Sequence, residues 1–251
     1  MLLVGALKRK SQWTISLDNF IFDVDGTLTP SRRRIDPEFH DHFLKFCENF
    51  NVYLVTGSDY PKTQEQLGDE ILQKVIVSFN CSGNSNWARG TEIYRDDFVV
   101  GEDLISFLKE KLEKSKFPTK GFTNIEYRPG MINFSIVGRP CTLEMRHLYK
   151  GWDDHKQERL QIALEIMDNF PGIVAQVAGE TGIDIFQHGR DKSQVAEWIP
   201  HPITFFGDNM QIGGNDHPLA VRLESYPRSH SIQVKDWKDT YNYLRTMTND
   251  V

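Results

Sequence analysis

Two aspartates, one residue apart, follow a short apolar stretch near the start of the chain, Phe20-Ile-Phe-Asp23-Val-Asp25-Gly26. We predict a β-strand over 20–24 that ends at these acids. Because side chains at i and i+2 of an extended chain point to the same side, Asp23 and Asp25 would face one space beyond the strand. In an open α/β sheet this is where ligands bind, and two carboxylates there suit Mg2+ and a carboxylate nucleophile. The same residues also fit an ordinary polar turn.

Further polar groups follow other predicted elements. Asp208 comes directly after an apolar stretch, 203–206, and Asp216 follows a few residues later. Ser58 lies in a Thr-Gly-Ser turn between a predicted strand and a helix, and Lys192 begins another predicted helix. A solvated helix-start lysine would have the same local sequence. Taken together, the order of nucleophilic acid, hydroxyl turn, lysine and distal acids resembles the haloacid dehalogenase (HAD) phosphotransferases.

Longer motifs narrow this resemblance to the eukaryotic-type phosphomannomutases, from about residue 20 to near the carboxyl end. The motifs that carry it are Asp23-Val-Asp-Gly-Thr-Leu-Thr-Pro-Ser-Arg32, Gly57-Ser-Asp59, Gln64-Glu-Gln-Leu-Gly68, Tyr127-Arg-Pro-Gly-Met-Ile-Asn133, Gly138-Arg139, Arg146 and Gly207-Asp208 through Gly213-Gly-Asn-Asp-His217.

The resemblance implies roles at the first group of residues. Asp23 would be the nucleophile that forms an aspartyl-phosphate, and Asp25 the general acid and base. Ser58 and Lys192 would bind the transferring phosphoryl group, and the lysine would also keep Asp23 ionised. The implied cofactor is Mg2+, which prefers oxygen ligands. Its implied ligands are Asp23, the Asp25 backbone carbonyl, Asp208 and Asp216, with Asn215 near Asp216.

A second set of residues is implied to hold the substrate. Guanidinium groups bind phosphate through paired hydrogen bonds, so arginines suit a second, non-reacting phosphate. By spacing alone these arginines also fit a solvated surface. The implied substrate-binding residues are Arg32, Arg128, Asn133, Arg139, Arg146 and Asp184. The chain departs from the family at Gly182, where a serine is typical, and we expect Gly182→Ser to restore a hydroxyl contact and sharpen preference for mannose.

Composition excludes several classes of protein. The chain has 251 residues, 39% hydrophobic and 25% charged, with a net charge of −6, which argues against a nucleic-acid partner. Three scattered cysteines do not make a disulfide framework, which favours a cytoplasmic location. No apolar run has the roughly 20 residues of a membrane span. The apolar leader 1–7 precedes its basic residues, unlike a secretory signal, and we expect an extra strand or arm there.

The element pattern predicts an α/β fold with a Rossmann-like core interrupted by an inserted α+β cap, and the resemblance implies that this core is a HAD core. We expect the core domain at 1–86 and 191–251 and the cap domain at 87–190, with a polar linker over 80–86 leading into the cap. Core strands are predicted at 20–24, 52–55, 75–79, 203–206 and 231–234, with helices near 36–50, 61–72, 191–198 and 236–246. Cap strands are predicted at 91–94, 125–137, 173–177 and 183–186, with helices over 102–115 and 143–170.

These features favour a Mg2+-dependent phosphomannomutase that interconverts mannose 6-phosphate and mannose 1-phosphate in GDP-mannose biosynthesis. The resemblance implies an aspartyl-phosphate, a hexose bisphosphate intermediate that also serves as activator, and a homodimer formed through the cap. A sugar-phosphate phosphatase of the HAD superfamily, with water as acceptor, is the first alternative. A non-catalytic binding protein on the same scaffold is the second, although a binder has no need of the whole set of acids, serine and lysine.

Overall fold

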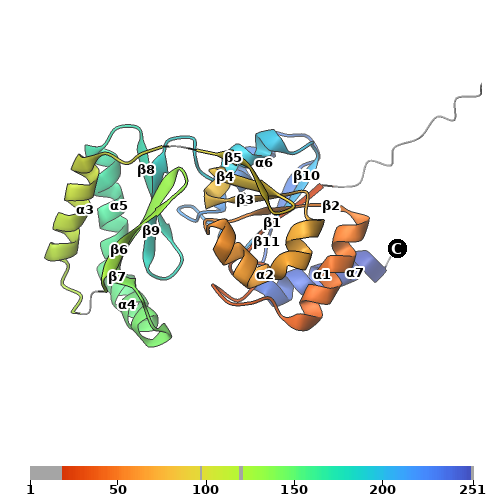
Figure 1. Ribbon diagram of the computed structural model, residues 1–251, viewed down its shortest axis with the longest axis horizontal. Coiled ribbons are helices and arrows are strands. Elements are labelled where there is room, and N and C mark those ends of the chain that lie inside the picture. The colour runs from red at the N-terminus through yellow and green to blue at the C-terminus, as the bar shows by residue number, and fades with distance from the viewer. Residues whose placement is uncertain (1–18, 97, 119–120, 250–251) are drawn as a thin grey trace, which may run out of the picture.

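The computed structural model describes residues 19–249 except 97, 119 and 120. Within these residues the chain forms two β-sheets, each with its own helices, that lie side by side (Figure 1). The expected strand or arm in the leader lies outside the described residues. In the described part of the chain, no helix combines the length and the apolar character needed to cross a membrane.

The first sheet places β1 between β10 and β2. Over the described residues its strand order is β11-β10-β1-β2-β3-β4-β5, and β1 pairs in parallel with both β2 and β10. Because parallel neighbours end at the same edge of a sheet, the residues that follow these three strands come together there. The parallel strands are β1 (Asn19–Asp23), β2 (Asn51–Val55), β3 (Val77–Asn80), β10 (Ile203–Gly207) and β11 (His230–Gln233).

Helices cover both faces of this sheet, which confirms the Rossmann-like α/β core. One face packs against α1 (Pro37–Asn49), α2 (Tyr60–Lys74) and α7 (Trp237–Asn249), and the other against the short 3-10 helix η2 (Lys192–Trp198) and α6 (His217–Glu224). Helix α1 begins where predicted, because the Asp36 carboxylate accepts hydrogen bonds from backbone N–H groups of the first turn. Phe39, Phe43, Phe46 and Phe50 recur at helical spacing and form an aromatic stripe on this helix. The first three are fully buried, and Phe50 is partly buried against the same core.

The second sheet is antiparallel, with the strand order β6-β7-β9-β8 among the described residues. Its helices α3 and α5 lie on the side away from the first sheet, so the opposite side of the sheet faces the first sheet (Figure 1). Alternate residues of β7 follow this division: Ile132 and Phe134 join the core beneath the helices, whereas Asn133 lines a cavity. The elements are α3 (Glu102–Lys114), β6 (Thr123–Arg128), β7 (Met131–Arg139), α4 (Leu143–Lys156), α5 (Glu158–Asn169), β8 (Ile173–Ala178) and β9 (Gly182–Gln187).

The prediction that residues 80–86 form a linker is wrong. This segment is buried and forms η1 (Cys81–Gly83) and the start of β4 (Ser85–Ala88). Its polar side chains bond inside the protein, as when the Asn80 amide donates to Thr63 Oγ1 at 2.7 Å. The strand expected to open the second domain is also placed differently, because β5 (Thr91–Arg95) pairs with β4 in the first sheet.

A predicted strand and a predicted helix are each divided into two elements in the structure. The expected strand 125–137 is a hairpin of β6 and β7 joined at Gly130, whose φ of +64° favours glycine. The expected helix 143–170 breaks at Gln157, which has a φ of +53°. Asp153 stabilises this break, because its carboxylate accepts a hydrogen bond from the backbone N–H of Arg159 at the start of α5.

The chain leaves the first sheet and returns to it at one place. Asp96, just after β5, forms an ion pair of 3.1 Å with Arg190, just before η2. The Asn84 amide also donates to the Arg190 carbonyl at 3.1 Å. The two crossings between the sheets are therefore held next to each other.

Candidate active site

Three aspartates meet at the carboxyl edge of the first sheet. Asp23 ends β1, Asp25 follows it in a tight loop, and Asp208 follows β10; all three line one cavity. A Cβ atom at Gly26 would lie 2.2 Å from Asp208 Oδ2, and Gly26 has a φ of +87°. Only glycine therefore allows the loop and Asp208 to approach this closely.

Lys192 lies buried behind Asp23. Its ammonium group donates to Asp23 Oδ1 at 2.5 Å and to Asp216 Oδ1 at 2.8 Å, and its side chain is 1% exposed. Asp216 is completely buried and also accepts a hydrogen bond from the backbone N–H of Asn209 at 3.0 Å. Lys192 thus binds Asp23 from inside the protein, with Asp216 as its second partner. Neither Lys192 nor Asp216 lines the cavity, unlike the other predicted site residues.

The acids outnumber the one buried ammonium group, and their pKa values reflect this. Burial raises the pKa of Asp23 well above its usual range, and Asp216 and Asp208 add to this effect although Lys192 opposes it. Burial, and then Asp216, raise the pKa of Asp208 to about 6. For Lys192 burial would lower the pKa, but Asp216 and Asp23 outweigh burial and raise it. The carboxyl groups at this edge of the sheet therefore outnumber the one positive charge that Lys192 supplies.

This donor set fits a divalent cation. One carboxylate oxygen from each of Asp23, Asp208 and Asp216 lies within 4.8 Å of the others. These are hard oxygen ligands, and the raised pKa values show that a further positive charge would be stabilising there.

Several donors hold Asp25. The backbone N–H of Arg32 donates to its Oδ1 at 2.5 Å, the Gln66 amide donates to the same atom at 2.9 Å, and the Ser58 hydroxyl lies 3.4 Å from Oδ2. The amide of Gln66 also donates to Thr29 Oγ1 at 3.0 Å, so it braces both ends of the loop. Gln66 was quoted in the sequence motif but given no role. The available signal was a polar residue next to Leu67 on the buried face of α2.

The opposite wall of the cavity carries a cluster of arginines paired with acids. Arg128 donates to Glu126 at 2.8 Å and to the Gly57 carbonyl of the first sheet at 3.0 Å. Arg139 Nε lies 3.5 Å from Glu126 Oε1 without a hydrogen bond. Arg146 donates to Glu180 at 3.2 Å. The two acids of this wall, Glu126 and Glu180, were not found from the sequence, because they belong to none of its motifs.

The positive charges on this wall repel one another. Burial lowers the pKa of Arg139, and the neighbouring Arg32, Arg146 and Arg128 lower it further, against the opposing effect of Glu126. An anion placed among these guanidinium groups would relieve that repulsion.

Asn133 on β7 and Asp184 on β9 line the cavity from the second sheet. The Asn133 amide donates to Asp184 Oδ1 at 2.7 Å, while Asn133 Oδ1 is buried without a hydrogen-bond partner. A Cβ atom at Gly182 would lie only 2.6 Å from Asn133 Nδ2. A serine at position 182 would therefore have to move the Asn133 amide, and the expected hydroxyl contact stays a prediction.

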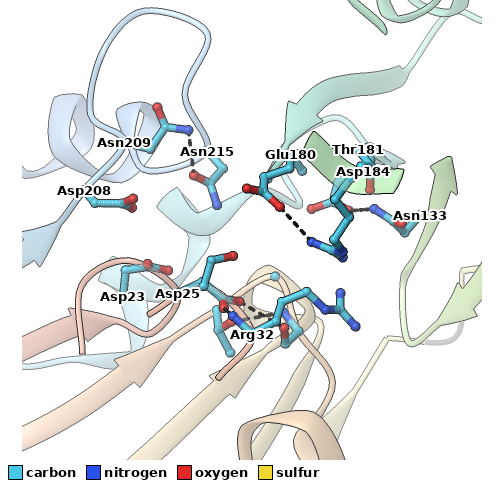
Figure 2. A pocket seen from close by; sticks show the side chains of 18 of the residues that line it. Asp23, Asp25, Arg32, Asn133, Glu180, Thr181, Asp184, Asp208, Asn209 and Asn215 are labelled. Atoms are coloured by element: carbon cyan, nitrogen blue, oxygen red, sulfur yellow. Dashed lines mark hydrogen bonds and ion pairs between the residues drawn. The ribbon is translucent and has the colours of Figure 1, made fainter. Parts of the chain in front are cut away.

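One cavity of about 320 Å³ joins these features. Asp23, Asp25 and Asp208 lie on one side of it, and Asn133 and Asp184 lie on the other (Figure 2). Its size suits a small ligand. Of the predicted residues, the cavity brings together Asp23, Asp25, Arg32, Ser58, Arg128, Asn133, Arg139, Arg146, Asp184 and Asp208.

Comparison with known proteins decides the family. A sequence model described as eukaryotic phosphomannomutase matches residues 39–250. This chain belongs to the eukaryotic phosphomannomutase family. It is 32% identical to "Phosphomannomutase" of Saccharomyces cerevisiae over 241 residues, covering 91% of this chain and 93% of that protein. It is 34% identical to human "Phosphomannomutase 1" over 239 residues, covering 90% of each.

Solved structures support the fold. The carboxyl-terminal domain of Candida albicans trehalose-6-phosphate phosphatase aligns with a TM-score of 0.66 at 13% identity, covering 93% of this chain and 92% of that chain. A haloacid dehalogenase-like hydrolase from Bacteroides thetaiotaomicron aligns with a TM-score of 0.57 at 14% identity, covering 92% and 99%. The HAD core is thus confirmed, and the family relationship confirms that the chain is an enzyme.

Replacing Gln66 tests whether its amide maintains Asp25. We expect Gln66→Leu to lower kcat roughly ten- to a hundredfold with little change in KM, since a hydrogen bond to a charged group contributes about 1.5–3 kcal/mol. Steady-state kinetics measures this, with Gln64→Leu on the exposed side of the same helix as the control. Equal kcat values in the two variants would contradict the role.

Gly182→Ser should destabilise the protein by about 1–3 kcal/mol, because the new side chain overlaps Asn133. Urea unfolding measures the change. Adding Asn133→Ala to Gly182→Ser should recover much of the loss, with Asn133→Ala alone as the control. A Gly182→Ser variant as stable as the wild type would show that Asn133 moves aside at no cost.

The raised pKa of Asp208 predicts that a fall in pH changes two quantities in opposite directions: the stability of the metal-free protein and the gain in Tm that Mg2+ gives. Without metal, the folded state binds a proton at Asp208 more tightly than the unfolded state, so stability should rise as pH falls through about 6. A divalent cation needs the carboxylate, so the gain in Tm from added Mg2+ should shrink over the same range. Thermal melting with and without Mg2+ checks both, and Asp208→Asn should remove both effects. A pH-independent Mg2+ effect would contradict this assignment.

Proposed function

We propose that this protein is a Mg2+-dependent phosphomannomutase that interconverts mannose 6-phosphate and mannose 1-phosphate through an aspartyl-phosphate on Asp23 and a hexose bisphosphate. The observation that carries the proposal is the pairing of two sites in one cavity. Asp23, which lines the same cavity as Ser58, offers a nucleophile at one side, and the arginines offer an anion site at the other. A reaction that moves a phosphoryl group between two ends of a sugar needs both.

The residues of the first sheet suit phosphoryl transfer. As a bond forms between an Asp23 oxygen and phosphorus, the bond from phosphorus to the sugar oxygen breaks, and Asp25 gives that oxygen a proton. In the second half-reaction the accepting hydroxyl oxygen bonds to phosphorus while Asp25 takes its proton, and the Asp23–phosphorus bond breaks. The donors that hold Asp25, including Gln66 and Arg32 N–H, keep it oriented for both steps. Mg2+, held by Asp23, Asp208 and Asp216, would offset the negative charge between Asp23 and the incoming phosphate.

The residues of the second sheet suit the other phosphate and the sugar. Arg128, Arg139 and Arg146 would hold the non-reacting phosphate, together with Arg32 from the first sheet. Asn133 and Asp184 would meet sugar hydroxyls, because they line the same cavity as the arginines. The proposal includes a hexose bisphosphate activator, which would prime Asp23 and reorient within the cavity.

The proposal extends to assembly and location. A homodimer through the second sheet and its helices is supported by apolar side chains exposed on α5, Leu160, Leu164 and Met167, which are each between 38% and 50% exposed. A cytoplasmic place in GDP-mannose biosynthesis is supported by the family relationship.

Replacing Asp23 tests the nucleophile. Asp23→Asn keeps the shape of the side chain and removes its nucleophilic charge, so we expect turnover to be lost while the protein stays folded. Conversion of mannose 1-phosphate with Mg2+ and catalytic glucose 1,6-bisphosphate, followed by phosphorus NMR, measures this. Asp59→Asn, which changes the residue that caps α2, controls for the loss of a carboxylate nearby. Turnover by the Asp23→Asn protein, with contamination excluded, would contradict the role of Asp23.

The same NMR time course on the wild-type protein separates a mutase from a phosphatase. A mutase should form mannose 6-phosphate much faster than inorganic phosphate, and it should depend on the bisphosphate. Accumulation of inorganic phosphate as fast as substrate disappears, with no mannose 6-phosphate, would establish the phosphatase instead.

A further inference from the structure

An acid that the proposed reaction does not use projects into the cavity. Glu180 lies in the turn between β8 and β9, and Figure 2 shows it between Asn215 of the first sheet and Asp184 of the second. Its carboxylate accepts a hydrogen bond from Arg146 Nη1 at 3.2 Å. The side chain of Arg146 is 10% exposed and that of Glu180 is 29% exposed, so solvent screens this ion pair only in part.

The turn that carries Glu180 is fastened from behind by a buried arginine. Arg159 Nη1 donates to the Gly179 carbonyl at 2.9 Å and to the Gly182 carbonyl at 3.4 Å, at the two ends of the turn. Arg159 Nε donates in turn to Asp153 Oδ2 at 2.7 Å, and both side chains are 7% exposed. The backbone beneath Glu180 is therefore held in place, which keeps its carboxylate within reach of Arg146.

The ion pair lies at the boundary between the cavity and an outer cleft. A second space of about 430 Å³ shares Arg32, Arg146 and Glu180 with the main cavity, and its own lining adds basic groups, Arg33 and Lys62 among them. An anionic ligand that reaches the arginines through this cleft meets Glu180 beside Arg146.

We propose that Glu180 is an exchangeable counter-ion of Arg146 that an incoming phosphate displaces, so that it limits how tightly the arginine wall holds anions. A phosphate and Glu180 compete for the same guanidinium group, and a carboxylate that remains beside the phosphate repels it. Glu180 therefore weakens anion binding and speeds the departure of a bound phosphate. This makes Glu180 an affinity-determining residue for the proposed reaction, in which a bisphosphate must release the arginines in order to turn round.

The inference rests on the proposed function only in taking a phosphate as the physiological ligand of Arg146, and it can be tested without turnover. Isothermal titration with sodium sulfate at constant ionic strength measures anion affinity directly. We expect Glu180→Gln to bind sulfate roughly two- to tenfold more tightly than the wild type, the range expected for losing one partly exposed ion pair. The matched control is Glu165→Gln, which removes a carboxylate paired with Lys111 outside the lining of the cavity.

A double substitution assigns the effect to Arg146. In an Arg146→Gln background, Glu180→Gln should leave sulfate affinity unchanged. Thermal melting checks that each variant is folded. If Arg146→Gln does not fold, Arg146→Lys replaces it, and the gain from Glu180→Gln should then be smaller than in the wild-type background.

Three results would overturn the inference. They are equal sulfate affinity in Glu180→Gln and wild type, an equal gain in the Glu165→Gln control, and a full gain in the Arg146 variants. If the protein shows the predicted sulfate affinities but no mutase activity, the proposed function is refuted, while the role of Glu180 as a counter-ion of Arg146 still holds. In an active protein, Glu180→Gln should lower KM for mannose 1-phosphate by the same two- to tenfold factor.

Discussion

The buried ammonium group of Lys192 is the interaction on which the site depends. It joins Asp23 at the end of β1 to Asp216 in the loop after β10, and so ties together segments that are 169 and 24 residues from the lysine in the chain. A buried charge is costly unless it is paired, and removing one partner leaves the others uncompensated. The loops at the carboxyl edge of the first sheet must therefore keep their positions for Lys192 to keep its partners. That requirement fixes the place of Asp23 before any ligand arrives.

Each wall of the cavity has a surplus of one sign of charge. On the wall of the first sheet the acids exceed the single ammonium group, and burial together with Asp216 raises the pKa of Asp208 to about 6. On the wall of the second sheet the arginines exceed Glu126 and Glu180, and burial together with the neighbouring arginines lowers the pKa of Arg139. A cation bound at the first wall would reduce the repulsion among its acids, and an anion bound at the second would reduce the repulsion among its arginines. The site is thus prepared for its ligands by charges that are incompletely balanced within the protein.

The parts of the fold that could be predicted are those set by local pattern. Strands that end in acids, the Asp36 cap and the phenylalanine stripe of α1 depend on residues close in sequence, and the structure contains all of them. The segment 80–86 was misinterpreted because its polar side chains find partners such as Thr63 far away in the chain. Polarity then indicates internal hydrogen bonds as well as exposure, and sequence alone does not distinguish them.

The unpredicted parts of the site have a similar cause. Gln66 contacts Asp25 across 41 residues, and Glu180 contacts Arg146 across 34 residues. Glu126 is different, because its partner Arg128 is only two residues away, but Glu126 belongs to none of the motifs. The break at Gln157 was hidden by helical periodicity that continues on both sides of it. That break lets Asp153 and Arg159 meet, and through Arg159 it determines the shape of the turn at Gly182.

The two segments that connect the sheets lie side by side, and this affects how a protein of this kind can evolve. Because Asp96 and Arg190 are in contact, the whole segment that bears the arginine wall begins and ends at one point on the surface of the first sheet. Segments whose ends lie close together can be exchanged or shortened without moving the framework that carries them. The phosphoryl-transfer machinery of Asp23 and Lys192 can therefore stay constant while the inserted part is replaced. The first sheet acts as a reusable module, and new substrates can be acquired by changing what is spliced between β5 and η2.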